Sequence, residues 1–174
     1  MGRFKLRFDE AVITELAGQY NYADDAGVLN EIGPRAREQG YFTRDDFQDI
    51  CRWKTSRSQS RVRANPAKFI EEATRISLST AIEEIRIGVL TLLHGVLMPT
   101  ASVVLHFAHE DPYPIIDFRA LWSLGINDRP QFYTFDYWWE YTEFCRELAE
   151  KHRVSMRDLD RALWQYSKEN QPRK

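Results

Sequence analysis

Apolar residues recur along most of this chain at spacings of three and four, which is the period of an α-helix. Two such segments follow residues that commonly cap helices, Thr43 and Asn65. Pro66 suits the first helical position, because proline lacks the N–H that this position leaves unpaired. The apolar positions of these two predicted helices are Phe47, Ile50, Cys51, Phe69, Ile70, Ala73 and Ile76.

The middle of the chain is the most apolar part. Thr80-Ala-Ile-Glu83 has the spacing of a capping box and predicts a helix that extends to about Leu93. That helix is apolar on more than one face, so we expect it to be central rather than on the surface. Pro99 then opens a second, nearly all-apolar helix over residues 101–108.

Loops and shorter helices follow. Residues 111–114 contain two prolines and predict a loop, and residues 126–135 predict a second one. Between them, Asp117 opens a short helix that Gly125 closes. The last two helices are predicted to begin at their caps, Asp136 and Ser155.

The segment Arg3–Phe8 alternates between basic and apolar residues, and it fits either an edge strand or an arm. We favour an arm packed by Phe4 and Phe8. Strand signals are few elsewhere, so the sequence predicts an all-α fold.

Composition narrows the class of protein. The 174 residues suit one helical domain, residues 1–174, and 43% of them are hydrophobic, which is typical of a globular chain. The net charge of −2 means that any nucleic-acid binding must be local.

Cys51 and Cys145 lack metal-ligand spacing and predict two reduced core thiols. Without an export signal, and with no apolar run longer than Ile87–Leu93, the chain is expected in the cytoplasm and away from membranes.

A local basic run provides one candidate binding surface. From Cys51 to Ile70 the chain has six basic residues and no acidic one. Cations at this density suit contact with a nucleic-acid phosphate backbone. The alternative interpretation of the run is a solvated loop whose charges balance acidic helices elsewhere in the chain. Four residues of the run are the expected DNA contacts: Lys54, Arg57, Arg61 and Arg63.

Two further features could contribute to chemistry. The segment from Leu93 to Ala101 places a glycine turn before a helix start, where free backbone amides can hold a phosphate; an ordinary tight connection is the alternative. Asp117 lies at a helix start, where the dipole favours its ionised form, and the alternative is simple N-capping.

Other chemistry is not expected. His106 and His109 are three residues apart but have no carboxylate at matched spacing, so we expect no metal site. The chain has neither a glycine-rich nucleotide loop nor a G-x-S-x-G motif, and no cofactor is expected.

Residues 85–125 resemble the core of the helix-hairpin-helix DNA glycosylases, the superfamily of endonuclease III and the 3-methyladenine glycosylases. The resemblance lies in the order of an apolar helix, a Leu-x-Gly-Val hairpin, a helix with Thr-Ala, an apolar pair, an aspartate and a helix ending Leu-Gly. It implies a two-lobed helical fold with a hairpin core at about residues 80–125. It also implies that Asp117 is the catalytic carboxylate and that hairpin amides hold a DNA phosphate. The corresponding hairpin residues are Gly95, Val96, Leu97, Met98 and Thr100.

Several positions depart from the family pattern and indicate a divergent bacterial branch. Leu97 replaces the second hairpin glycine, and His94 replaces a proline. Pro99 occupies the position of the lysine with which some members form a Schiff base, which excludes lyase chemistry there. The helix from Asp117 to Gly125 is about one turn shorter than the family pattern, and two cysteines cannot supply an iron–sulfur cluster.

The resemblance therefore predicts a monofunctional DNA glycosylase that removes a damaged or modified base and binds DNA weakly or only at damage. Candidate residues of its base pocket are Trp53, Tyr113 and Trp122. One alternative is a nucleic-acid-binding relative that has lost the chemistry. Another is a helical protein-interaction module that uses exposed aromatic residues of the segment 133–139.

Overall fold

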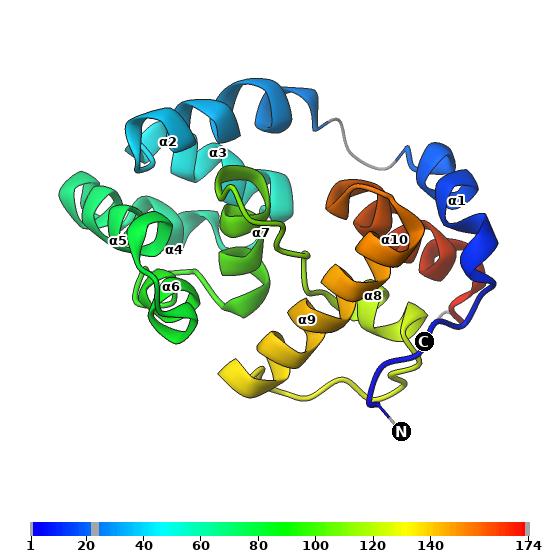
Figure 1. Cartoon of the computed structure of the whole chain (residues 1–174). Coiled ribbons are helices and arrows are strands. Elements are labelled where there is room, and N and C mark those ends of the chain that lie inside the picture. The colour runs from blue at the N-terminus through cyan, green and yellow to red at the C-terminus, as the bar shows by residue number, and fades with distance from the viewer. Residues whose placement is uncertain (1, 22–24, 173–174) are drawn as a thin grey trace. The chain divides into compact units, whose positions relative to one another are not determined.

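The computed structural model describes residues 2–21 and 25–172, and all regular secondary structure in these ranges is helical. The all-α prediction is therefore confirmed for this part of the chain (Figure 1). Contacts divide the chain into two compact units: unit 1 is Met1–Tyr22 with Pro112–Lys174, and unit 2 is Ala23–Asp111. This division agrees with the two lobes expected, whereas the assignment of residues 1–174 to a single domain stays a prediction.

Unit 2 is built around one buried helix, α7, which packs against α2, α3 and α6 (Figure 1). Every residue of α7 from Thr100 to Ala108 is buried except His106. The helical elements of this unit are η2 (Val28–Ile32, a π-helix), α2 (Gly33–Gln39), α3 (Arg44–Lys54), α4 (Gln59–Arg63), α5 (Ala67–Ser79), α6 (Glu83–Leu90) and α7 (Met98–Ala108).

The prediction that the helix after Thr80 is central was wrong. That helix, α6, ends at Leu90 rather than at about Leu93. Ile82, Ile85 and Leu92 are 57%, 44% and 63% exposed, so the apolar residues on these faces of the segment do not enter the core. Ile87 and Leu90 are buried, and α6 is consequently a surface helix that buries one side.

Three predicted caps were also wrong, because other residues occupy the extended backbone positions at the helix starts. Pro66 precedes α5 in place of Asn65. Ile82 precedes α6, and Thr80 Oγ1 accepts from the Ile82 amide, so no capping box forms. Thr134 caps α9 in place of Asp136, since its side chain accepts from Tyr137 N.

Thr43 and Ser155 cap their helices as predicted. Thr43 accepts from Asp46 N at the start of α3, and Ser155 accepts from Asp158 N at the start of α10. In both cases the hydroxyl satisfies an amide that has no partner within its helix.

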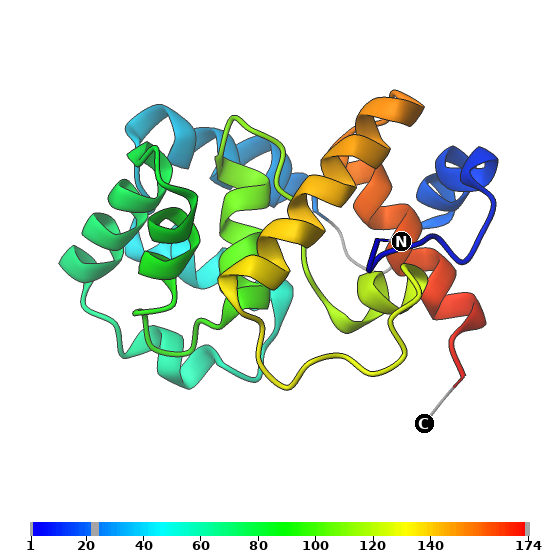
Figure 2. The same cartoon turned by 60° about the horizontal axis from the view of Figure 1, so that its bottom comes forward.

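Unit 1 pairs α1 with the last helix, α10, as both views of the chain show (Figure 2). The N-terminal segment is an arm, as predicted: its backbone donates from Lys5 N to Leu124 O at 3.0 Å, and Phe4 is buried at 5% exposure. Phe4 packs against Tyr137, Tyr141 and Phe144. The elements of unit 1 are η1 (Glu10–Val12, a 3-10 turn), α1 (Ile13–Gln19), α8 (Phe118–Ser123), α9 (Phe135–His152) and α10 (Met156–Asn170).

Gly33 shows how closely α2 approaches α7. A Cβ atom at this position would lie 2.3 Å from the carbonyl oxygen of Phe107, which is backbone and cannot rotate away. We therefore expect Gly33→Ala to lower the free energy of unfolding by about 1–3 kcal/mol, measured by denaturant titration.

Gly88 in α6 is the matched control, because nothing lies within 4 Å of its Cβ position. Gly88→Ala should raise stability by up to about 1 kcal/mol. Equal stability of the two alanine variants would contradict this close packing.

Candidate functional site

The hairpin between α6 and α7 is a tight turn with a glycine at its bend. Val96 N donates to Leu93 O at 3.1 Å, and Gly95 has a φ of 80°, a left-handed conformation that suits glycine. Val96 is 2% exposed and Thr100 is 6% exposed, so these two predicted contacts face inward and anchor the hairpin. Leu97 is 70% exposed and lies on the solvent side.

The hairpin leaves backbone donors available where the family resemblance predicts a phosphate. Thr100 N and Ala101 N both donate to Leu97 O, which forms the first turn of α7. In the part of the chain that the structure describes, the amides of Gly95, Leu97 and Met98 have no protein acceptor. Such amides at a helix start can hold an anion, so the local geometry is compatible with phosphate binding.

The basic run lies directly beside this hairpin. A Cβ atom on Gly95 would be 3.0 Å from Arg61 Cβ and 3.0 Å from Ser58 O, so the turn rests on α4. Arg57, Arg61 and Arg63 are exposed, whereas Lys54 at the end of α3 is half-buried. The structure thus brings together two sets of residues that the sequence predicted separately.

Two residues near this surface were missed by the sequence analysis. Arg44 is exposed at the start of α3, and its Nη2 donates to Arg63 O at 2.8 Å, which adds a cation beside the run. Asn65 is 1% exposed and contacts the hairpin backbone at His94. No local pattern indicates either contact, because both join segments that are distant in the sequence.

Asp117 occupies the N-cap of α8, in unit 1. Its Oδ1 accepts from Arg119 N and from Ala120 N, both at 2.9 Å. The preceding pair is fixed in the core: Ile115 and Ile116 are buried, and the Tyr141 hydroxyl donates to Ile115 O at 2.9 Å. The capping interpretation of Asp117 is therefore confirmed, and its catalytic role stays a prediction.

Asp117 also acts electrostatically on a neighbouring tyrosine. Burial raises the pKa of the Tyr133 hydroxyl above its usual value, the Arg129 guanidinium opposes this shift, and the charge of Asp117 reinforces it. The charge of Asp117 is thus the smallest of the causes that act on the pKa of the Tyr133 hydroxyl.

The three aromatic pocket candidates each pack against other side chains. Trp53 meets Phe107 edge to face at 5.0 Å. Trp122 stacks on Tyr166 at 5.8 Å, and the Arg7 guanidinium lies 4.6 Å from its centroid. Their role as pocket residues stays a prediction.

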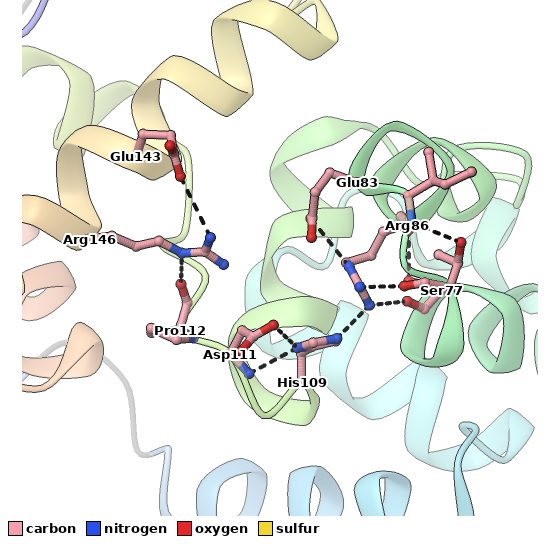
Figure 3. A network of polar contacts seen from close by, with 10 residues as sticks. Ser77, Glu83, Arg86, His109, Asp111, Pro112, Glu143 and Arg146 are labelled. Carbon is pink, nitrogen blue, oxygen red and sulfur yellow. Dashed lines mark hydrogen bonds and ion pairs between the residues drawn. The ribbon is translucent and has the colours of Figure 1, made fainter.

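Tyr113, the third candidate, is completely buried. Its ring stacks on Trp138 at 5.8 Å and lies 4.6 Å from the guanidinium of Arg146. Arg146 is itself held by Pro112 O and by Glu143, as Figure 3 shows. These contacts fix the loop that leads to Asp117.

The segment 133–139 does not present the aromatic surface that an interaction module was expected to use. Trp138 is completely buried, and the four other aromatic residues of the segment are only partly exposed. Tyr133 packs against Tyr137, and Phe135 stacks on Trp139. The expectation of exposed aromatic residues there was wrong, because these rings pack against one another and against the core.

A buried arginine, Arg86, connects α5, α6 and the end of α7 within unit 2 (Figure 3). It is 5% exposed, and it donates to Ser77 O at 2.9 Å, to Thr80 O and to the Glu83 carboxylate. Its Nη1 also contacts Nε2 of His109. The guanidinium therefore satisfies carbonyls left open at the end of α5.

His109 has an unusual environment for a histidine. Both ring nitrogens face N–H groups, from Arg86 on one side and from the Asp111 backbone at 3.0 Å on the other. Burial lowers the pKa of His109, and the charge of Arg86 lowers it further, while the carboxylates of Asp111, Glu83 and Glu110 oppose the shift. The folded state thus favours the neutral ring.

This shift predicts an acid-dependent loss of stability. The unfolded chain takes up a proton at the ordinary histidine pKa of about 6.5, and the folded chain only at lower pH. The contribution of His109 to the free energy of unfolding should therefore be present above about pH 6.5 and fall as the pH drops towards the folded-state pKa. His109→Gln should flatten the pH dependence in denaturant titrations, whereas His94→Gln, at an exposed histidine of the same unit, should not. Identical pH profiles for wild type and His109→Gln would contradict this.

Within residues 2–21 and 25–172, no group of three or more histidine, cysteine or acidic residues is placed to hold a metal ion. Cys51 and Cys145 are free and buried, as predicted, and burial raises the pKa of Cys51 to about 12. None of the described helices combines the length and the apolar character that crossing a bilayer requires.

Comparison with solved structures identifies one similarity. The chain is similar to the 8-oxoguanine glycosylase/lyase of Methanocaldococcus jannaschii, solved in complex with a 15mer DNA containing 8-oxoguanine. The sequence identity is 18% and the TM-score is 0.48, over 94% of this chain and 84% of that chain. No protein-family model and no curated protein sequence matches the chain.

Proposed function

We propose that this protein is a monofunctional DNA glycosylase that removes a damaged or modified base. The observation that carries the proposal is the contact of the Gly95 turn with Arg61, which places the hairpin amides beside the arginines of α4. Amides and guanidinium groups on one surface provide two kinds of donor for phosphate oxygens. DNA binding is accordingly assigned to the hairpin and the basic run together.

Asp117 is assigned the chemical step. A glycosylase turns its target nucleotide out of the stack, and the bond between sugar and base then breaks as positive charge develops on the sugar. The base leaves with the bonding electrons, and water adds to the sugar to give an abasic site. A carboxylate close to that sugar would stabilise the cation through its charge. Oδ1 of Asp117 caps α8, and this holds the carboxyl group in one orientation.

The products distinguish this mechanism from a lyase. Pro99 has no amine, so no Schiff base can form at the position where some relatives carry a lysine. We expect the reaction to yield a free base and an intact strand with an abasic site. Strand cleavage without added alkali would contradict the monofunctional assignment.

The test is single-turnover base release from duplexes that carry alkylated, deaminated or oxidised bases. Free base is measured by chromatography, and abasic sites are measured by alkaline cleavage. Release from at least one duplex at a rate above the protein-free control supports the proposal. Absence of both base release and duplex binding across the panel would contradict it.

A second candidate function is DNA binding without catalysis. It is favoured by Leu97, which stands where the family has a second hairpin glycine, and by the capping bonds that engage Oδ1 of Asp117. The two candidates differ in one result. A relative that has lost the chemistry would bind the same duplexes with steep salt dependence and release no base.

A further inference from the structure

Asn65 is a buried polar side chain between α4 and α5, and it makes no cap. It is 1% exposed, and its amide has three hydrogen bonds. Nδ2 donates to Val62 O at 2.9 Å and to His94 O at 3.0 Å, and Oδ1 accepts from His94 N at 2.8 Å. Every hydrogen of the amide nitrogen is therefore used, and the oxygen is paired with a backbone amide.

These bonds connect the hairpin to α4, and these are the two parts of the proposed DNA-binding surface. The Asn65 amide binds both the N–H and the C=O of His94, the residue immediately before Gly95, and so fixes the entry into the turn. The third bond, to Val62 O, fixes the end of α4. One side chain thus sets the position of the hairpin relative to the helix that carries Arg61.

We propose that Asn65 is a positioning residue that aligns the hairpin amides with Arg61, so that both bind DNA phosphates. The proposal rests on the proposed DNA-binding function of this surface. A rigid connection matters because backbone amides cannot move independently to find a phosphate, whereas an arginine side chain can. Loss of the connection should release the hairpin without removing any cation.

The amide is well suited to this position chemically. An aspartate would place a carboxylate against the carbonyl oxygens of Val62 and His94, to which it cannot donate. An alanine would leave the carbonyl and the amide of His94 without this buried partner, whereas Val62 O would keep the backbone amide of residue 65 as a donor. Asn65→Ala is therefore the direct test, and Asn65→Ser, which retains a hydroxyl, replaces it if the alanine variant does not fold.

A purely structural role needs a matched control. Thr74 is also completely buried in unit 2, where Oγ1 accepts from Phe42 N at 2.9 Å and donates to Ile70 O at 2.7 Å. Its partners lie outside the hairpin. Thr74→Val should therefore lower stability through lost hydrogen bonds, as Asn65→Ala does, but leave the position of the hairpin unchanged.

The experiment measures the dissociation constant of a short fluorescent DNA duplex across a salt series, well below the melting temperature of each variant. Asn65→Ala should weaken binding by about tenfold or more, since a hydrogen bond to a charged group is lost. The slope of log affinity against log salt should stay near its wild-type value, because the lost contact is made by uncharged backbone amides and no cation is removed. Thr74→Val should leave both quantities at their wild-type values.

A double variant tests whether Asn65 acts through the turn. Gly95→Ala places a Cβ atom 3.0 Å from Arg61 Cβ and Ser58 O at a positive φ, and so displaces the same turn independently. The binding losses of Asn65→Ala and Gly95→Ala should then be far from additive. Hydrogen exchange of the His94 amide, measured without DNA, should accelerate in Asn65→Ala and stay unchanged in Thr74→Val.

The outcomes separate this proposal from the function on which it rests. Wild-type protein that shows no salt-dependent binding contradicts the proposed function, and the role of Asn65 in DNA binding with it. Salt-dependent binding that survives Asn65→Ala at wild-type strength overturns the role of Asn65 alone. Additive losses in the double variant also overturn it, because they show that Asn65 acts independently of the Gly95 turn. Equal weakening by Thr74→Val overturns it as well, because it indicates an effect on stability only.

Discussion

Asp117→Asn is expected to slow single-turnover base release by about a hundredfold to a thousandfold, the usual effect of removing one preorganised electrostatic group. Asparagine keeps an oxygen that can accept from Arg119 N and Ala120 N, so the cap of α8 should persist. Only the negative charge disappears. The loss should therefore fall on the chemical step, while folding and DNA affinity change little.

The matched control for this variant is Asp136→Asn. Asp136 is an exposed aspartate in the first turn of α9, in the same unit, and Thr134 rather than Asp136 caps that helix. The control removes the same charge from a helix start and should release base at the wild-type rate. Equal rates for wild type and Asp117→Asn would exclude a catalytic role. A much lower melting temperature of Asp117→Asn would show that the aspartate serves mainly as a cap.

The second large effect is expected from neutralising the basic run. Replacing Arg57, Arg61 and Arg63 together by glutamine should reduce the slope of log affinity against log salt by about three units, since each lost phosphate contact removes about one. Binding should weaken to a similar extent for all sequences, because phosphate contacts carry no sequence information. The measurement is a salt series of duplex titrations with at least two unrelated sequences.

A control with the same change in net charge makes this result specific. Arg75, Arg153 and Lys168 are exposed cations outside the run, and glutamine at these three positions should leave the slope at its wild-type value. If the slope of the Arg57, Arg61 and Arg63 variant also stayed unchanged, the run would not be part of the DNA-binding surface.

The sequence predicted the helices better than it predicted their environment. Helical spacing depends on local residues, so the helices after Thr43 and Ser155 begin where expected. Which helix lies at the centre depends on tertiary packing. The segment around Ile85 and Leu92 has apolar residues on several faces, yet these side chains remain exposed, because unit 2 packs around α7. The charged residues Glu83, Glu84 and Arg86 of α6, which have no counterpart in α7, were the signal in the sequence that could have distinguished the two helices.

The candidate site also depends on tertiary contacts that the local sequence does not indicate. Gly95 and Arg61 were each selected from local patterns, but their contact is tertiary and follows only from the fold. Asn65 was interpreted as a helix cap from the proline that follows it, because this dipeptide is a common helix start. Its actual partner, His94, has no signal in the neighbouring sequence. Asp117 was located correctly as a cap, and the capping bonds alone do not distinguish a structural from a catalytic carboxylate.

The two cysteines have a practical consequence, because each unit contains one of them: Cys51 in unit 2 and Cys145 in unit 1. Burial raises the pKa of both thiols, that of Cys51 to about 12. Neither thiol therefore forms the reactive thiolate at neutral pH while its unit is folded. Labelling by a thiol reagent then requires the surrounding unit to open. The labelling rate at each cysteine reports the opening equilibrium of its own unit, so the unmodified chain contains separate internal probes of how cooperatively the two units unfold.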